Sequence, residues 1–327
     1  MEVPRTHVPD LRTILKAALL YHSGKAQKEI AKQLGLTPST VSRLLARSRD
    51  FVELRYHVPG NSELEAKLVN KFGLMDAVVV ETGSQEQATA IVGQAAAQQF
   101  LSEVKVGDAV ALSCGETLLE MLKALPTQPS LRLTISQLSV ESDASTIHQS
   151  PATLVGLLRA KCSPRSDVIG VQLPPLGVVP VEKEFREQFR KGALLQTLRT
   201  RALRSNVIFI GVGNPAAGTG SFCRIADQAT RGRFQSYVRR LDLVGEINNR
   251  VYDRKGKDRT DDVPGLSELA ISIITLDDLK RLAKNRTKHR VIGIATGLNK
   301  IEAIRVALQM NVMSVLVTGR DTAERFV

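Results

Sequence analysis

The sequence predicts an α/β protein with a small all-α N-terminal domain, residues 1–57, and a larger α/β domain, residues 58–327. Before residue 57 the apolar residues recur every three to four positions, which is typical of amphipathic helices. After residue 73 short β-branched runs alternate with helical patterns, which favours a mostly parallel sheet covered by helices on both faces. A chain of 327 residues is also long enough for about two domains.

The composition argues against several kinds of site. Aromatic residues make up 4% of the chain and Trp is absent, which argues against a platform on which bases stack. No apolar stretch approaches the roughly 20 residues that span a bilayer, and the first residues have no signal-peptide pattern, so we expect a cytoplasmic protein. Cys114, Cys162 and Cys223 form no C-x-x-C pair, so we expect neither a metal site nor a disulfide framework.

Positive charge is concentrated near the N-terminus. The formal net charge is +12, and residues 1–57 contain ten Lys and Arg against five Asp and Glu, a net of +5. A basic segment of this kind favours a polyanionic partner such as nucleic acid.

The N-terminal segment has the pattern of three short helices. Apolar spacing predicts a helix over 11–21 and a second over 27–34, which closes at Gly35. Thr37 suits the N-cap of a third helix, and Pro38 suits its first position, where the missing N–H costs nothing. Short helices joined by a glycine turn predict a helix-turn-helix, whose second helix enters the major groove of DNA.

Polar and basic side chains around this last helix are the candidates for contacts with DNA. Those at its start are expected to meet base edges, whereas Lys28 and Arg47 are better placed for phosphate oxygens. The predicted DNA-binding residues are Gln27, Lys28, Thr37, Ser39, Thr40, Ser42, Arg43 and Arg47.

The larger domain alternates between strand-like and helical patterns. An extended connector over 51–60 precedes a helix over 63–72. The predicted strands are 77–80, 109–112, 133–138, 168–171, 207–210, 270–274, 291–295 and 315–317. The predicted helices between them include 88–104, 117–124, 183–194 and 300–308.

Three loops that follow predicted strands are candidates for a ligand site, because ligands of parallel sheets bind beyond the carboxyl ends of the strands. Residues 113–117 could surround an anion with backbone N–H groups. Residues 211–213 have a glycine at each end, which allows the backbone to approach a ligand closely. Residues 295–300 combine a glycine with a lysine at a helix start, which suits a phosphate or carboxylate.

The stretch VIFIGVGNPAAG, residues 207–218, matches the spacing of a dinucleotide fingerprint, G-x-G-x-x-G/A. Such a fingerprint must open a helix directly, whereas here Pro215 and two further glycines predict a long loop. No suitable acidic residue stands about 20 positions further on, because Asp227 lies in a polar stretch. We therefore expect no cofactor, and we interpret the stretch as one wall of a ligand pocket.

Joined to the helix-turn-helix, the larger domain resembles the SorC (SorC/DeoR-like) family of bacterial transcriptional regulators from about residue 11 to the C-terminus. The segments that carry the resemblance are IAKQLGLTPSTVSRLLARSR (30–49), LSCGETL (112–118), VQLPPLG (171–177), VIFIGVG (207–213), VGEINNRVYD (244–253) and VIGIATGLNKIEAIRVAL (291–308). The resemblance implies a Rossmann-like, NagB/RpiA/CoA-transferase-like effector domain that binds a small, often phosphorylated, sugar. It also implies that the sugar changes the affinity for DNA and that the protein is a homo-oligomer, commonly a tetramer.

Carried over onto this sequence, the resemblance implies that Ser113, Gly115 and Thr117 hold a phosphate together with Lys300. It implies that Glu246 and Asp253 accept hydrogen bonds from sugar hydroxyls, a task that suits carboxylate oxygens. The predicted effector-binding residues are Ser113, Gly115, Glu116, Thr117, Gly211, Gly213, Glu246, Asp253, Gly297 and Lys300.

Two departures from the family pattern bear on the effector. The first loop commonly has the sequence S-W-G-R-T in the family and S-C-G-E-T here, so Glu116 places an anion where a cation is usual. The glycine pair that usually follows the next strand is absent, and residues 137–140 are QLSV. Either Glu116 points away from the ligand, or this effector carries less negative charge than a sugar phosphate.

We therefore predict a transcriptional regulator, not an enzyme, whose binding to double-stranded operator DNA is controlled by a small sugar or sugar phosphate. The alternative is a sugar-phosphate isomerase-like enzyme, which would need an acid/base pair such as Glu246 with Asp253.

Overall fold

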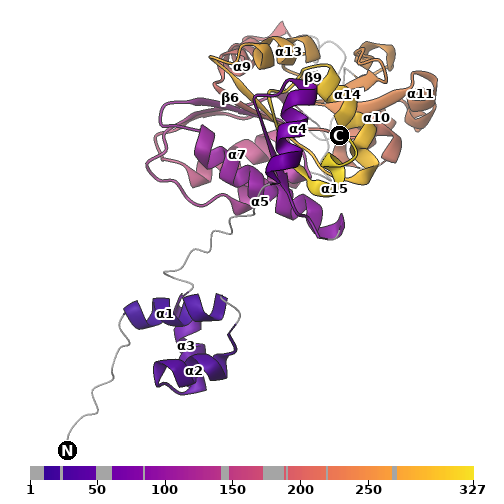
Figure 1. Cartoon of the computed structure of the whole chain (residues 1–327). Helices are drawn as coiled ribbons and strands as arrows, with labels where there is room; N and C mark the ends of the chain where they lie inside the picture. The colour runs from indigo at the N-terminus through magenta and orange to yellow at the C-terminus, as the bar shows by residue number, and fades with distance from the viewer. Residues whose placement is uncertain are drawn as a thin grey trace, which may run out of the picture. The chain divides into compact units, whose positions relative to one another are not determined.

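The computed structural model describes residues 11–22, 25–48, 61–83, 85–140, 147–171, 188, 191–218, 220–266 and 271–327. The chain divides into two compact units, Met1–His57 and Val58–Val327 (Figure 1). None of the helices in the described ranges combines the length and the apolar character that crossing a membrane requires.

The described residues of the first unit form three helices, α1 (Leu11–His22), α2 (Gln27–Leu34) and α3 (Pro38–Ser48). They enclose a small apolar core, which consists of Ile14, Ala17, Ile30, Ala31, Val41 and Leu44. α2 ends at Gly35, whose left-handed φ of 65° lets its N–H bond back to the carbonyl of Ala31. The Thr37 hydroxyl accepts the N–H of Thr40 at 3.2 Å and so caps α3. The helices and their caps therefore agree with the predicted helix-turn-helix.

The second unit is built on a parallel sheet. Among the described residues, seven strands form it in the order β1-β11-β10-β6-β2-β3-β5. The strands are β1 (Asp76–Val80), β2 (Ala109–Leu112), β3 (Thr134–Gln137), β5 (Asp167–Ile169), β6 (Val207–Gly211), β10 (Arg290–Ile294) and β11 (Val315–Gly319). The predicted α/β fold class is thus confirmed.

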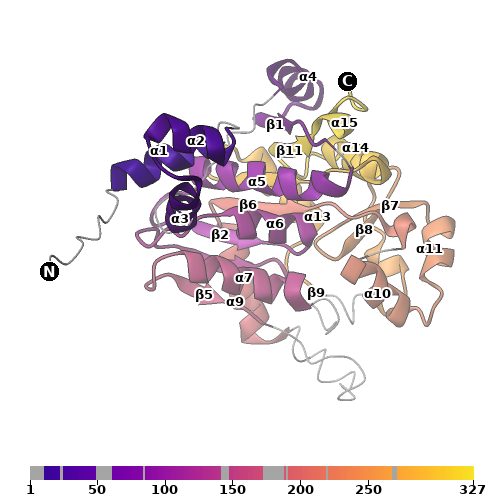
Figure 2. The same ribbon diagram turned by 90° about the horizontal axis from the view of Figure 1, so that it is seen from below.

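Helices cover both faces of this sheet (Figure 2). Because side chains alternate along a strand, Val207 and Phe209 of β6 join one apolar core while Ile208 and Ile210 join another. The first core lies under α5 (Gln85–Glu103), α6 (Glu116–Ala124) and α7 (Pro151–Lys161). The second lies under α4 (Ser62–Phe72), α9 (Ala193–Arg204), α13 (Leu276–Lys284), α14 (Ile301–Gln309) and α15 (Arg320–Ala323).

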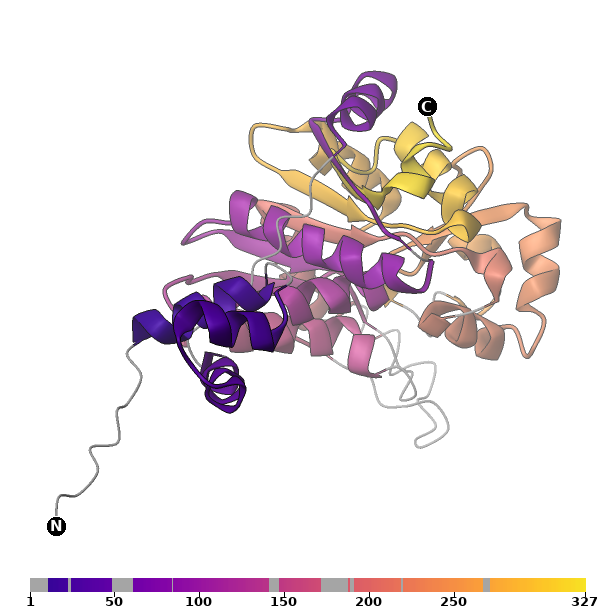
Figure 3. The ribbon, with the colours of Figure 1, turned by 60° about the horizontal axis from the view of Figure 1, so that its bottom comes forward.

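A lobe formed by residues 220–266 lies at one end of the sheet (Figure 3). It contains α10 (Gly220–Ala229), α11 (Phe234–Arg240) and a hairpin of β7 (Leu243–Ile247) and β8 (Arg250–Asp253). Asn248 and Asn249 form the two-residue turn of the hairpin with φ of 55° and 62°, as the favoured hairpin turns require. The lobe has an apolar cluster of its own, which includes Phe222, Ile225, Phe234, Val251 and Leu266.

Short elements complete the described part of the second unit. Four are turns of 3₁₀ helix: η1 (Ile147–Gln149), η2 (Pro215–Ala217), η3 (Thr260–Asp262) and η4 (Leu298–Lys300). Two are short strands, β4 (Ser139–Val140) and β9 (Ile271–Ser272), which pair antiparallel with each other.

The structure corrects one expectation about these elements. The predicted strand 270–274 does not join the parallel sheet, because Ile271 and Ser272 pair instead with β4, just beyond the end of β3. The loop predicted after Gly213 is present, since α10 begins only at Gly220, and η2 is a short turn within that loop. The predicted helix 183–194 falls mostly outside the described residues, and within them α9 begins at Ala193.

Candidate functional site

A cavity of about 390 Å³ lies at the point where the strand order of the parallel sheet reverses. From β2 the chain continues outward to β3 and β5, and then returns to place β6 on the other side of β2. The loops that follow β2 and β6 therefore diverge, which leaves a crevice beyond the carboxyl ends of the two strands. The cavity is lined by these loops, by the loop after β10 and by side chains of the 220–266 lobe.

The loop after β2 forms the wall on which α6 begins. Ser113 and Thr117 are buried, and Gly115 has a φ of 120°, a conformation that disfavours any residue with a Cβ. The Gly115 N–H donates to the carbonyl of Gln149 at 3.3 Å, which ties this loop to η1. Glu116 is the first residue of α6, so its carboxylate lies at the positive end of the helix dipole.

The loop after β6 is held against Glu246 of β7. The Gly213 N–H donates to the Glu246 carbonyl at 2.8 Å, and the Glu246 N–H donates back to the Gly213 carbonyl at 3.1 Å. A Cβ added at Gly213 would stand 2.6 Å from Oε2 of Glu246, and one at Gly211 would stand 3.3 Å from the Cys114 carbonyl oxygen. The two glycines thus let the backbone of this loop approach the other walls of the cavity.

Glu246 is a buried carboxylate with a fixed orientation. The residue is only 8% exposed, and its Oε1 accepts the N–H of Asn249 at 2.7 Å. Because Asn249 belongs to the tight turn of the hairpin, the hairpin itself holds the carboxylate at the cavity wall.

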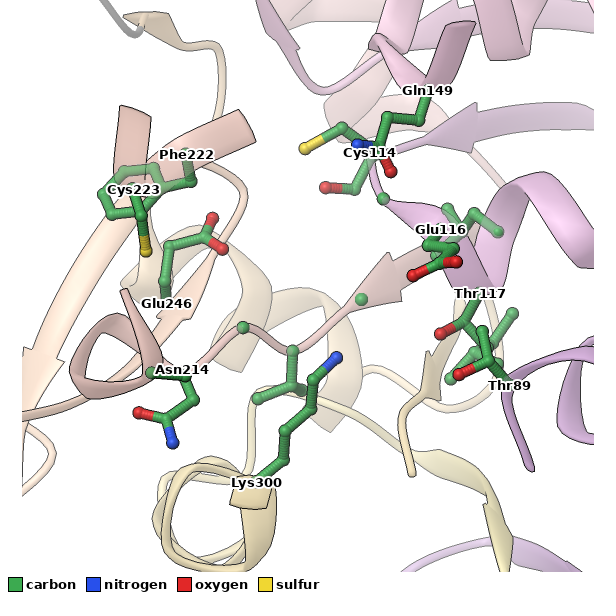
Figure 4. Close-up of a pocket in the computed structure, with 18 of the residues that line it drawn as sticks. Thr89, Cys114, Glu116, Thr117, Gln149, Asn214, Phe222, Cys223, Glu246 and Lys300 are labelled. Carbon is green, nitrogen blue, oxygen red and sulfur yellow. The ribbon is translucent and has the colours of Figure 1, made fainter. Parts of the chain in front are cut away.

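Lys300 enters the cavity from the loop after β10. Figure 4 shows its side chain pointing into the space between Glu116 and Glu246. Burial lowers the pKa of the Lys300 ammonium, while the negative charges of Glu246 and Glu116 oppose that shift. Among the described residues of the lining, one basic side chain therefore lies between two carboxylates.

Eight of the ten predicted effector-binding residues line this cavity: Ser113, Gly115, Glu116, Thr117, Gly211, Gly213, Glu246 and Lys300. Gly297 is not among the lining residues; its φ of 120° shapes the third loop, and its N–H donates to the Thr322 hydroxyl at 2.9 Å.

Asp253 does not line the cavity either. Its side chain is 5% exposed and accepts hydrogen bonds from Arg259 Nε at 2.7 Å and from the N–H groups of Lys255 and Lys257. Burial alone would raise the pKa of this carboxyl, but these partners outweigh burial and lower it. The Asp253 carboxylate, which the resemblance assigns to sugar hydroxyls, is therefore hydrogen-bonded within the protein, where it stabilises the turn after β8.

The structure also brings residues into the cavity that the sequence did not single out. Thr89 comes from α5, Gln149 from η1, and Phe222 and Cys223 from α10. Asn248 comes from the hairpin turn; its Nδ2 donates to Leu138, Ser272 and Ile274, and Ser113 Oγ stands 3.5 Å from its Oδ1. A polar pair of asparagines between two β-branched runs is the signal that could have located this turn.

Gln137, which stands where the family has a glycine pair, bridges the end of β3 to Val171. Its Nε2 donates to the carbonyls of Ser139 and Val171, and its Oε1 accepts the Val171 N–H. This buried amide is thus a structural element and is not among the residues that line the cavity.

The predicted DNA-binding residues all belong to the first unit. Val41, Leu44 and Ser48 mark the buried face of α3, and the opposite, exposed face carries Ser39, Ser42, Arg43 and Arg47. Gln27 and Lys28 are exposed at the start of α2, and Thr37 is exposed before α3. Thr40 is half-buried, and its hydroxyl lies 2.8 Å from that of Thr37, so these two residues also form the cap of α3.

The geometry gives little support to isomerase chemistry. Glu246 lines the cavity, but Asp253, the acid expected to work with it, is bound to Arg259 elsewhere in the lobe.

A helix-turn-helix unit followed by a parallel α/β unit, with a small polar cavity where its strand order reverses, defines a ligand-responsive DNA-binding regulator. Residues 56–327 match the family described as "Putative sugar-binding domain", and the chain belongs to that family. Residues 9–51 match the family described as "Homeodomain-like domain".

The chain is similar to named bacterial regulators over nearly its whole length. The sorbitol operon regulator of Klebsiella pneumoniae is 28% identical over 331 residues, which cover 96% of this chain and 97% of that protein. The deoxyribonucleoside regulator of Bacillus subtilis (strain 168) is 25% identical over 327 residues, 96% of each protein. The crystal structure of the full-length sorbitol operon regulator SorC from Klebsiella pneumoniae matches with a TM-score of 0.66 at 26% identity, and the match covers 96% of this chain and 97% of that one.

These matches confirm the predicted resemblance to SorC/DeoR-like regulators. The chain is a sugar-responsive DNA-binding transcriptional regulator and not an isomerase, as expected from its sequence.

Proposed function

We propose that the protein binds operator DNA through the exposed face of α3 and that a small sugar or sugar phosphate in the cavity controls this binding. One observation carries the proposal: three loops from separate strands, together with Glu246 and Lys300, form one polar cavity in a chain that also contains a helix-turn-helix. An effector there would favour one arrangement of the subunits over another and thereby change the affinity for DNA.

We propose further that the protein acts in the cytoplasm as a homo-oligomer, with a tetramer as the expected form. The resemblance to SorC/DeoR-like regulators supports this assembly, and sedimentation of the full-length chain measures it.

Operator binding is tested with DNA from upstream of the protein's own gene and its neighbours, compared with DNA of shuffled sequence. Fluorescence anisotropy should show preferred binding to one upstream fragment, and binding should weaken as salt rises. Arg43→Ala should reduce this preference, because Arg43 is exposed on α3 where base edges are expected. Lys32→Ala is the matched control, since Lys32 is an exposed basic residue of α2 outside the predicted set. Equal binding to upstream and shuffled DNA would refute the proposal.

Control by the effector is tested on the same complex of the protein with operator DNA. A sugar that binds the cavity should shift the DNA-binding curve of the wild type but not that of Lys300→Ala. Lys280→Ala removes a lysine from the surface of α13 and should respond like the wild type. A sugar response that survives in Lys300→Ala would place the effector elsewhere.

A further inference from the structure

The charges that face the cavity are unusual for a site that holds a phosphate. Among its described lining residues Lys300 is the only basic side chain, and Glu116 and Glu246 are the only acidic ones. Two acids and one base give the described part of the lining a formal net charge of one negative unit, which repels an anionic ligand.

Glu116 occupies the position where a phosphate would otherwise benefit from a helix terminus. It is the first residue of α6, a nine-residue helix preceded by Gly115, whose lack of a side chain leaves this end of the helix without a side-chain cap. The N-terminal N–H groups of such a helix favour negative charge, and here the chain supplies that charge itself. Glu116 lines the cavity, as Figure 4 shows, and it is also exposed to solvent.

Glu246 cannot easily withdraw from the opposite wall. Its Oε1 is held by the Asn249 N–H at 2.7 Å, and its backbone is hydrogen-bonded to that of Gly213 in both directions. The Lys300 ammonium interacts with both carboxylates, as their effect on its pKa indicates. A phosphate would therefore have to compete with the carboxylates of Glu116 and Glu246 for the charge of Lys300.

The remaining polar groups suit hydroxyls. The lining also includes the hydroxyl residues Ser113, Thr117, Thr89 and Thr296 and the amide residue Gln149. Ionised carboxylates only accept hydrogen bonds, so they bind O–H groups well and phosphate oxygens poorly. A volume of about 390 Å³ is at the small end of ligand pockets and fits a single sugar.

We propose that the effector is an uncharged polyhydroxylated molecule, a free sugar or sugar alcohol, and that Glu116 is the residue that discriminates against phosphorylated forms. This inference rests on the proposed function of the cavity and narrows its ligand class. Glu116 acts by charge: it accepts from a ligand hydroxyl, and it raises the free energy of any phosphate placed at the start of α6.

The test measures binding of matched pairs by titration calorimetry on the full-length chain. The panel is ribose, fructose, glucose and sorbitol, each with its terminal phosphate ester, and operator binding is followed in parallel samples. The wild type should bind at least one free member about tenfold or more tightly than its phosphate ester. Glu116→Gln should bring the affinities for the free sugar and its phosphate ester closer together, and Glu116→Arg should make the affinity for the ester the higher of the two.

Glu120→Gln is the matched control, because Glu120 stands one turn further along α6, pairs with Lys123 and does not line the cavity. It should keep the wild-type ratio. Thermal melting of each ligand-free variant verifies folding, and Glu116→Gln preserves the shape of the side chain.

The outcomes separate this inference from the proposed function. If a phosphate ester binds the wild type more tightly than its free sugar and still shifts operator binding, the charge inference is wrong and the regulator remains. If Glu116→Arg leaves the ratio unchanged, Glu116 does not select the ligand. If no member binds and operator binding responds to none, the sugar-responsive function fails and the inference falls with it.

Discussion

Replacing Gly213 by Ala tests how closely the β6 loop and Glu246 are packed. The new Cβ would stand 2.6 Å from Oε2 of Glu246, 3.7 Å from its Cδ and 3.5 Å from its Cβ, so only the carboxylate produces a severe clash. The loop cannot move away freely, because the backbones of Gly213 and Glu246 bond to each other in both directions. If the backbone shifts, overpacking lowers the free energy of unfolding by about 1–3 kcal/mol. If the carboxylate rotates, the loss of its bond to Asn249 costs about 1.5–3 kcal/mol.

The assay is urea unfolding followed by circular dichroism, with two other Gly→Ala variants for comparison. Gly211→Ala meets its nearest neighbour at 3.3 Å and should cost less, under about 1 kcal/mol. Gly156 lies on the exposed side of α7 with open space around it. Gly156→Ala should therefore raise the free energy of unfolding by about 0.5–1 kcal/mol, because Ala favours a helix.

A double variant decides whether the carboxylate is the cause. In a Glu246→Ala background the clashing oxygens are gone, so Gly213→Ala should cost at least about 1 kcal/mol less than in the wild type. An equal cost in both backgrounds would refute the reasoning and point to the backbone of the loop instead.

Three further predictions concern other parts of the chain. Burial opposes ionisation of Asp278, but hydrogen bonds with Thr275 and the charge of Arg199 outweigh burial and lower the pKa of this carboxyl from 3.8. The ionised carboxylate therefore stabilises the folded state above about pH 4, and this stabilisation is lost as the pH falls through the lowered pKa. Asp278→Asn should therefore cost about 1–3 kcal/mol at pH 7, and the free energies of unfolding of variant and wild type should converge as the pH falls through the lowered pKa; a difference that stays constant with pH would contradict this. Tyr252→Phe removes the buried hydroxyl that donates to the α14 backbone at 2.8 Å and should lower the urea midpoint by the equivalent of about 1 kcal/mol, with an unchanged m-value. Lys28→Ala should leave the melting temperature unchanged and reduce the slope of log affinity for DNA against log salt by about 1, whereas an unaltered slope would remove Lys28 from the DNA interface.

Local patterns were sufficient to predict the elements whose signals lie within a few residues. The β-branched run at 207–210 became a central strand, and Gly35 and Thr37 end and begin helices as their types favour. The three loops at the candidate site could also be predicted to meet, because parallel strands place their carboxyl ends at one edge of the sheet.

Features that depend on distant partners could not be predicted in this way. The acid Asp253 looks free in sequence, and only the turn after β8 brings Arg259 to it. Thr89 and Gln149 reach the cavity because α5 and η1 pack beside α6, a consequence of tertiary packing that no periodicity contains. The run 270–274 has a strand-like composition, but pairing with β4 removes it from the parallel sheet.

The separate apolar cluster of the 220–266 lobe has a consequence for the order in which parts of the protein unfold. A lobe with its own core can unfold as a cooperative unit of its own, and its attachments to the rest of the chain include the Gly213–Glu246 pairing and the Tyr252 hydroxyl. A ligand held between Glu246 and Lys300 joins the lobe to the sheet, so its binding free energy adds to the energy of opening the lobe. At a hundred times the Kd this amounts to about 2.7 kcal/mol, and amide hydrogens of β7 and β8 should then exchange with solvent about a hundredfold more slowly. The exchange map of these few strands would thus report effector binding without any DNA present.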